Sequence, residues 1–139
     1  MKNNYSVIFL SMLFLFTSAC NKDLNKVTST VIDQMIVNKT WHLDYSIIGT
    51  NTQSFVGQTS YSITYFKDGT TKDSDGLSGT YTISNNNNGQ YQIQVNGTSV
   101  NGNALNYTHI IESVSDITMV QSFILSGQST KTSLYFSSK

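Results

Sequence analysis

Short runs of alternating apolar and polar residues recur from residue 40 to residue 137, separated by glycine, asparagine, aspartate and serine. In the first run, every second residue is apolar: Trp41, Leu43, Tyr45 and Ile47. This period of two is typical of a half-buried β-strand, because successive side chains point to opposite faces of a sheet. Residues that favour strands dominate all of these runs, so we predict an all-β fold.

Turn signals divide this region into eight predicted strands. We expect them over residues 40–48, 53–56, 59–66, 79–83, 91–95, 104–114, 117–125 and 130–137. Their even spacing suits a barrel or a sandwich. Eight strands can close into a barrel that is just wide enough to fill itself or to hold one small ligand.

A short helix is predicted ahead of the strands, over residues 27–37. Its apolar residues share one helical face: Val27, Val31, Ile32, Met35 and Ile36. We expect this helix to dock on the domain or over one end of a barrel. Residues 20–26 read as a tether, and residues 27–139 as one barrel domain.

Residues 1–19 have the layout of a secretory signal peptide. Lys2 precedes an apolar run over residues 7–16, and the small residues Thr17, Ser18 and Ala19 follow it. The run is about 10 residues long, whereas a helix that spans a bilayer needs about 20. We therefore predict a cleaved signal rather than a transmembrane helix.

Cys20, the only cysteine of the chain, comes directly after these small residues. This arrangement resembles the lipobox of bacterial lipoproteins. In that family the cysteine becomes the first residue of the mature chain and carries lipid on its sulfur and its amine. The resemblance implies that lipid on Cys20 holds the protein on a membrane. Asn21 is not the aspartate that retains many lipoproteins in the inner membrane, so we expect the outer membrane, and either of its faces.

Four short motifs resemble the lipocalin-like domain family of bacterial lipoproteins: KTWHL at 39–43, YFKDGT at 65–70, GTYTI at 79–83 and LYF at 134–136. The resemblance implies an eight-stranded antiparallel up-and-down (lipocalin-like) barrel with a short N-terminal helix. It also implies that the barrel binds a small apolar ligand. In lipocalins a late arginine packs on the tryptophan of the first strand. This chain has no arginine, and Lys131 is the nearest substitute for it.

Aromatic residues on the apolar faces of the strands are the candidate ligand-binding residues. They are Trp41, Tyr61, Tyr81 and Tyr91. Such side chains can line a pocket, but they can equally be ordinary core, because aromatic rings supply much of the buried area of a small domain. The alternative function is therefore a non-enzymatic interaction or structural module of the outer membrane, with a filled barrel and an exposed apolar patch.

We predict no enzyme and no metal site. His42 and Asp44 share one strand face, but a third ligand such as His109 would have to come from elsewhere. The aspartates 68, 73 and 75 fit an Asp/Gly-rich loop better than a calcium loop. Glu112 is the only glutamate, which excludes a glutamate pair for glycoside hydrolysis.

The charge composition argues against nucleic acid as a partner. The net charge is +0 and the chain shows no basic patch. We expect no cofactor and a monomeric protein. Its expected partners are the membrane, through lipid on Cys20, and either a small apolar ligand or an envelope protein.

Overall fold

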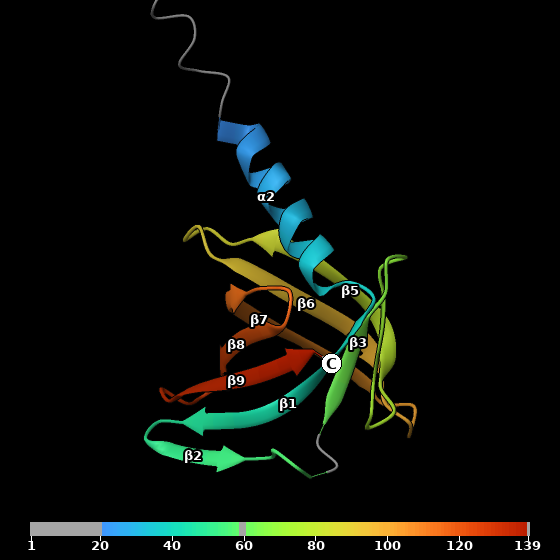
Figure 1. The fold of residues 1–139 in the computed structure, drawn as a ribbon, viewed down its shortest axis with the longest axis vertical. Helices are drawn as coiled ribbons and strands as arrows, with labels where there is room; N and C mark the ends of the chain where they lie inside the picture. Colours follow the sequence, from blue (N-terminus) through green and yellow to red (C-terminus); the bar gives the residue numbers. More distant parts are fainter. Residues whose placement is uncertain (1–20, 59–60, 139) are drawn as a thin grey trace, which may run out of the picture.

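The computed structural model describes residues 21–58 and 61–138, with only the helical backbone described for residues 21–28. The predicted signal peptide and Cys20 lie outside these residues. Within the described residues, one helix precedes nine strands (Figure 1). The elements are α2 (Asn21–Ile36), β1 (Lys39–Ile48), β2 (Asn51–Ser54), β3 (Ser62–Tyr65), β4 (Thr70–Asp73), β5 (Ser78–Asn85), β6 (Tyr91–Thr98), β7 (Ala104–Val114), β8 (Thr118–Ile124) and β9 (Lys131–Ser138).

Eight of the strands form a closed barrel. From β3 to β9 each strand pairs antiparallel with the next along the chain, and β1 pairs with β3 at one edge and with β9 at the other. The β1–β9 ladder, which closes the ring, runs from Trp41 opposite Ser138 to Ile48 opposite Thr132. The predicted all-β, eight-stranded, antiparallel up-and-down barrel with an N-terminal helix is confirmed.

The eight barrel strands are not the eight runs that the alternation predicted. β4 belongs to the barrel, although its sequence TTKD has no apolar alternation and was expected to be part of a loop region. β2 was counted as a strand but lies outside the ring, because it pairs only with the second half of β1. There it occupies the edge of β1 that β3 leaves unpaired.

A β-bulge interrupts the first strand at Asp44. The register with β9 shifts between Leu43 and Tyr45, which inserts one extra residue into β1. Trp41 and Leu43 therefore point into the barrel before the bulge, and Ser46 is the buried residue after it. The expected continuous apolar face through Tyr45 and Ile47 was wrong, since an extra residue in a strand reverses the faces of all residues after it.

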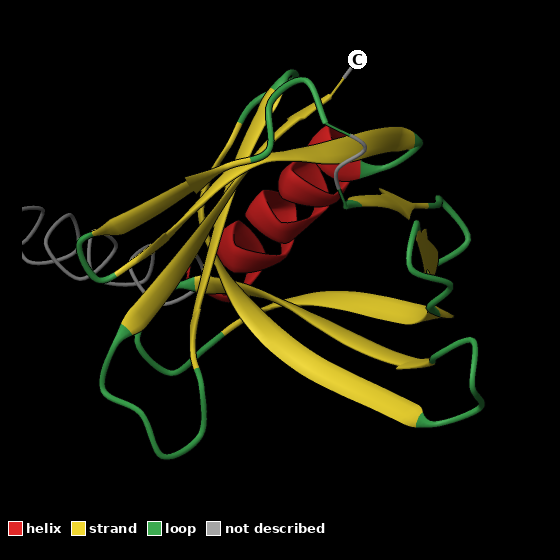
Figure 2. Ribbon diagram, turned by 90° about the horizontal axis from the view of Figure 1, so that it is seen from below, coloured by secondary structure: helices red, strands yellow, loops and turns green. Residues whose placement is uncertain are grey.

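The helix closes one end of the barrel. Figure 2 shows it inside the outline of the surrounding strands. Its last residue, Ile36, is fully buried, and Ile32 packs against the core, whereas Val31 stays 42% exposed. The helix begins at Asn21 rather than at Val27, so the segment expected to be a tether is helical. No helix within residues 21–58 and 61–138 has the length and hydropathy needed to cross a membrane.

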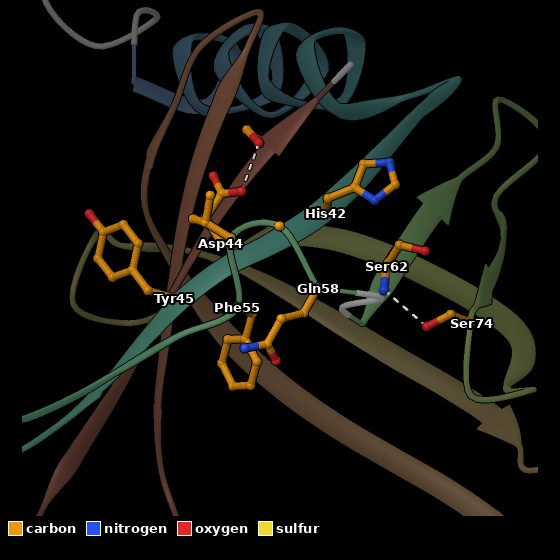
Figure 3. Close-up of a pocket in the computed structure, with 10 residues that line it drawn as sticks. His42, Asp44, Tyr45, Phe55, Gln58, Ser62 and Ser74 are labelled. Atoms are coloured by element: carbon orange, nitrogen blue, oxygen red, sulfur yellow. Dashed lines mark hydrogen bonds between the residues drawn. The ribbon is translucent and has the colours of Figure 1, made fainter.

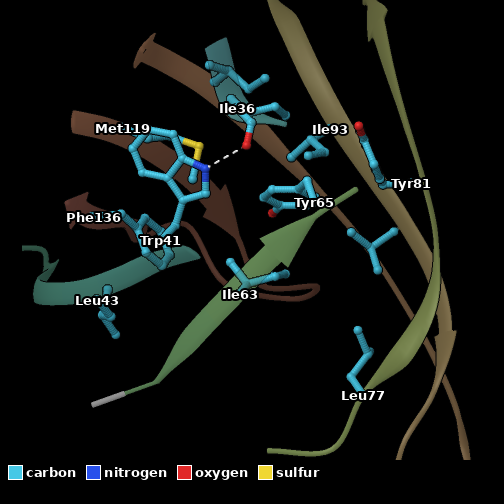
Figure 4. Packing of buried hydrophobic residues seen from close by; sticks show 12 residues of the cluster. Ile36, Trp41, Leu43, Ile63, Tyr65, Leu77, Tyr81, Ile93, Met119 and Phe136 are labelled. Carbon is cyan, nitrogen blue, oxygen red and sulfur yellow. Dashed lines mark hydrogen bonds between the residues drawn. The ribbon is translucent and has the colours of Figure 1, made fainter. Parts of the chain in front are cut away.

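The hydrophobic core runs from the end of the helix into the barrel (Figure 4). Trp41 is fully buried, and its indole Nε1 donates a hydrogen bond of 3.0 Å to the backbone oxygen of Ile36. Tyr65 and Tyr81 pack edge to face, with ring centroids 5.0 Å apart. The core thus joins the helix end to the first, third and fifth strands and seals this end of the barrel.

Candidate functional site

The barrel interior contains a cavity of about 170 Å³. Its walls are mainly aromatic and aliphatic: Tyr61, Ile63, Tyr65, Tyr107, His109, Gln121, Phe123, Leu134 and Phe136. Tyr107 lies near the start of β7 and Phe123 near the end of β8. In an antiparallel barrel these strand ends meet at the end opposite α2, so the cavity extends from the helix-sealed core towards the other end.

Gln121 is the polar centre of the cavity wall and is only 2% exposed. Its amide nitrogen donates to Tyr65 Oη at 3.3 Å, so its oxygen Oε1 faces Nδ1 of His109 at 2.9 Å. A carboxamide oxygen can only accept, which requires His109 to carry its proton on Nδ1. The two hydrogen bonds of Gln121 therefore select one neutral tautomer of His109.

Three rings from two neighbouring strands form a ladder along one wall. The imidazole of His109 lies 4.7 Å from the Tyr107 ring and stacks on Phe123 at 4.6 Å, measured between ring centroids. Burial lowers the pKa of His109, while its hydrogen bond to Gln121 opposes that shift. Because burial is the larger cause, the imidazole is neutral at pH 7 and behaves as part of an uncharged aromatic wall.

The tyrosine hydroxyls of the cavity are also held in their neutral form. Burial raises the pKa of Tyr107 to about 12, and it raises the pKa of Tyr61 well above its usual range. The interaction between the two hydroxyls raises the pKa of Tyr61 further and lowers that of Tyr107. The cavity thus offers polar atoms without any formal charge.

The four residues predicted for ligand binding are separated by the structure. Only Tyr61 lines the cavity. Trp41 and Tyr81 are buried in the core near the helix, and Tyr91 is partly buried against that core. Their assignment to ligand binding stays a prediction, and Trp41 and Tyr81 have structural contacts that account for their burial.

The other polar and aromatic groups of the cavity were missed. Tyr107 and His109 have the spacing of two that places them on one face of a strand, but polar neighbours obscure the pattern in that run. Gln121 was missed because a buried glutamine looks like a surface residue in sequence. A partner that comes from another strand, such as Tyr65, is visible only after folding.

A larger hollow of about 840 Å³ lies on the outer side of β1, beside the connection from β2 to β3 (Figure 3). His42 and Asp44 both line it, as their shared strand face predicted, but Figure 3 shows their side chains directed apart. Asp44 accepts a hydrogen bond of 3.0 Å from Ser137. Within the described residues, no group of three or more acidic, histidine or cysteine side chains could hold a metal ion.

The aspartates of the predicted Asp/Gly-rich loop close turns of the backbone. Asp68 Oδ1 accepts from the backbone nitrogen of Thr70 at 2.9 Å. Asp73 Oδ1 accepts from the backbone nitrogens of Asp75 and Leu77 at 2.9 and 2.8 Å. These contacts are typical of Asx turns and account for both side chains.

Lys131 does not pack on Trp41 as the expected substitute for the lipocalin arginine. It lies at the opposite end of β9 and pairs with Glu112 at 2.5 Å. Lys39 takes the position near the tryptophan instead, with its ammonium 5.8 Å from the ring centroid. The reason is the ladder register, which places Trp41 opposite Ser138, at the other end of the strand from Lys131.

Comparison with known proteins does not extend this description. The chain matches no protein-family model, and it has no significant match among curated proteins or solved structures. The resemblance to lipocalin-like lipoproteins therefore stays a prediction from short motifs, and what the structure shows is the closed eight-stranded barrel.

Proposed function

We propose that this protein is a lipid-anchored lipoprotein of the outer membrane whose barrel binds a small apolar molecule. The anchor is proposed from the sequence, in which Cys20 follows an apolar run and three small residues. Binding rather than catalysis is proposed because the barrel interior carries uncharged, mostly apolar walls.

The arrangement of helix and cavity is consistent with this role. The helix begins at Asn21, next to the proposed lipid site, and its other end seals the barrel at Ile36. The cavity lies beyond the core that this end seals. An anchor on Cys20 would thus hold the protein by the helix and leave the other barrel end directed away from the membrane.

The observation that carries the ligand proposal is the unfilled volume inside the barrel. Protein interiors are close-packed, and voids larger than a water molecule are few. An apolar cavity of about 150 Å³ in another protein takes up benzene. At about 170 Å³, this cavity has room for a ligand with a single ring.

Toluene binding to the full-length protein tests this proposal by calorimetry or NMR titration. Toluene should bind, and Leu134→Phe should abolish binding, because Leu134 lines the cavity and a larger ring there fills it. Leu125→Phe is the matched control, since Leu125 is 51% exposed and lies outside the cavity lining. Failure of toluene to bind, or equal loss of binding in both variants, would contradict a ligand site in the barrel.

The anchor has a separate test. Cys20→Ser removes the proposed lipid attachment atom and should move the protein from the outer-membrane fraction to the soluble fraction of cells. Labelling with a palmitate analogue should be lost at the same time. Ser18→Thr, which leaves Cys20 in place, serves as the control. Unchanged membrane association of Cys20→Ser would overturn the anchoring proposal.

One observation favours a second candidate function, docking of an envelope protein. Large apolar side chains are exposed at the barrel end opposite the helix, including Val100 at 76% and Leu125 at 51%. Exposed apolar surface of this kind is found at interaction sites. Replacement of Val100 and Leu125 by serine should abolish cross-linking to a partner if this function is correct, and it should leave toluene binding unchanged.

A further inference from the structure

One ring nitrogen of His109, Nε2, is not used in the hydrogen bond to Gln121. The other, Nδ1, is bonded to Gln121, and in the neutral tautomer Nε2 is a pure acceptor. Among the described residues, Nε2 has no hydrogen-bond partner. Asn85 Oδ1 is the only fully enclosed polar side-chain atom of these residues without a partner, so Nε2 is accessible to space that water can enter. His109 lines the cavity, which identifies that space with the cavity or its opening.

The neighbouring Tyr107 has the complementary atom. Tyr107 lines the cavity, and a phenolic hydroxyl can donate its hydrogen to an acceptor. No hydrogen bond of standard geometry joins this hydroxyl to an acceptor among the described residues. Tyr107 and His109 stand two residues apart on β7, with ring centroids 4.7 Å apart, and both line the cavity. The cavity wall therefore carries an acceptor and a donor on neighbouring rings of one strand.

We propose that the cavity selects a small neutral phenol. Its hydroxyl donates to Nε2 of His109 and accepts from the hydroxyl of Tyr107, while its ring lies among the apolar walls. A hydroxyl fits because one oxygen both donates and accepts. This inference rests on the proposed ligand site and adds the chemical class of the ligand.

The composition of the walls supports a neutral ligand with one polar group. The cavity residues carry no formal charge, so an ionised ligand would lose its hydration without gaining a partner ion. The remaining lining is aromatic or aliphatic apart from Gln121, whose amide is already bonded on both sides to His109 and Tyr65. A site that holds unpaired polar atoms discriminates against an analogue that lacks the matching group.

The test compares phenol, toluene and anisole on the full-length protein at pH 7.5. Toluene replaces the hydroxyl by a methyl group of similar size, and anisole keeps the oxygen but has no donor. Phenol should bind about tenfold more tightly than either analogue, which is the usual effect of one unmatched buried hydrogen-bonding group. Anisole must lose this advantage, because its ether oxygen cannot donate to Nε2.

His109→Phe keeps an aromatic ring in the ladder and removes the acceptor. It should reduce the preference for phenol over toluene about tenfold, and an unchanged circular dichroism spectrum reports that the variant is folded. His42→Phe is the matched control, since His42 lies on the outer side of β1 and should alter neither affinity.

The outcomes separate this inference from the function on which it rests. If toluene binds and phenol binds no more tightly, the phenol assignment is overturned and the apolar ligand site stands. The same holds if anisole equals phenol, or if His109→Phe keeps the preference for phenol over toluene. If none of the three ligands binds, the ligand site itself fails, and the assignment fails with it.

Discussion

The hydroxyl of Tyr81 donates a hydrogen bond of 2.9 Å to Asp33 Oδ1, which ties β5 to the last turns of α2. The same hydroxyl lies 3.2 Å from the backbone oxygen of Phe66. Burial, and after it the contact with Asp33, raises the pKa of Tyr81 above its usual range. The phenol therefore stays protonated as a donor, and the helix is held on the barrel by a polar contact as well as by apolar packing.

Tyr81→Phe should destabilise the protein by about 1 kcal/mol, because it removes this hydrogen bond and little volume. The free energy of unfolding from denaturant titration measures the effect. Tyr91→Phe is the control, since Tyr91 is partly buried on the next strand and has no hydroxyl partner among the described residues. Equal stability losses in the two variants would show that the bond to Asp33 contributes nothing.

Trp41→Phe should lower the free energy of unfolding by about 2–3 kcal/mol, more than Tyr81→Phe does. It leaves a void in the core and deprives the backbone oxygen of Ile36 of its indole partner. The loss should appear as a lower midpoint in thermal unfolding followed by circular dichroism. Tyr45→Phe, on the outer face of the same strand, should change the midpoint little. A near-native midpoint for Trp41→Phe would contradict the packing of the helix end on this ring.

Gly79→Ala should destabilise the barrel by at least about 2 kcal/mol. A Cβ at Gly79 would lie 2.3 Å from the backbone oxygen of Asn96 and 2.5 Å from the Cα of Gly97, and backbone atoms cannot rotate away. Ser78→Ala, at an exposed position next to it, is the control for chemical denaturation. Wild-type stability of Gly79→Ala would mean that β5 and β6 do not approach this closely.

The free energy of unfolding should decrease as the pH is lowered from 6.5 towards the depressed pKa of His109 in the folded protein. Burial depresses the pKa of His109 in the folded state, so below about pH 6.5 the unfolded chain binds a proton that the folded protein does not. This part of the stability is complete above pH 6.5 and is lost as the pH decreases. His109→Phe should show a shallower slope of unfolding free energy against pH in this window.

The difference in this slope between wild type and His109→Phe separates the contribution of His109 from that of the carboxyl groups. Glu112 also has a lowered pKa, because of its hydrogen bonds to Lys131 and Ser122, but its contribution is lost at more acidic pH. Identical slopes for wild type and His109→Phe would show that the imidazole titrates normally and is not held neutral by burial.

Much of the fold followed from local patterns. The alternation around Ile63 and Tyr65, and that of Ile93 and Val95, predicted strands whose inward residues are indeed buried. The pattern was weaker where geometry departs from a regular ladder. The bulge at Asp44 reversed the faces of β1, and a bulge depends on the strand that lies opposite it.

The cavity was predicted only in outline. Eight strands and many aromatic residues were compatible with a filled barrel or with one that holds a small ligand, and Tyr61 was one of the candidate ligand-binding residues. The chain could not show that Trp41 and Tyr81 would be taken up by contacts with the helix. Residues that serve as core and residues that line a void have the same periodicity, so only packing distinguishes them.

The sequence by itself determined the strand-rich fold, the turns at aspartate, asparagine and glycine, and the prediction of an anchor at Cys20, because these depend on neighbouring residues. The tertiary structure decided which strands close the ring, where β2 lies, and which polar atoms meet inside. The contact of His109 with Gln121 joins two strands, and the partner of each is set by the register of the β7–β8 ladder. Such pairs depend on the whole closed barrel, and no local pattern of residues encodes them.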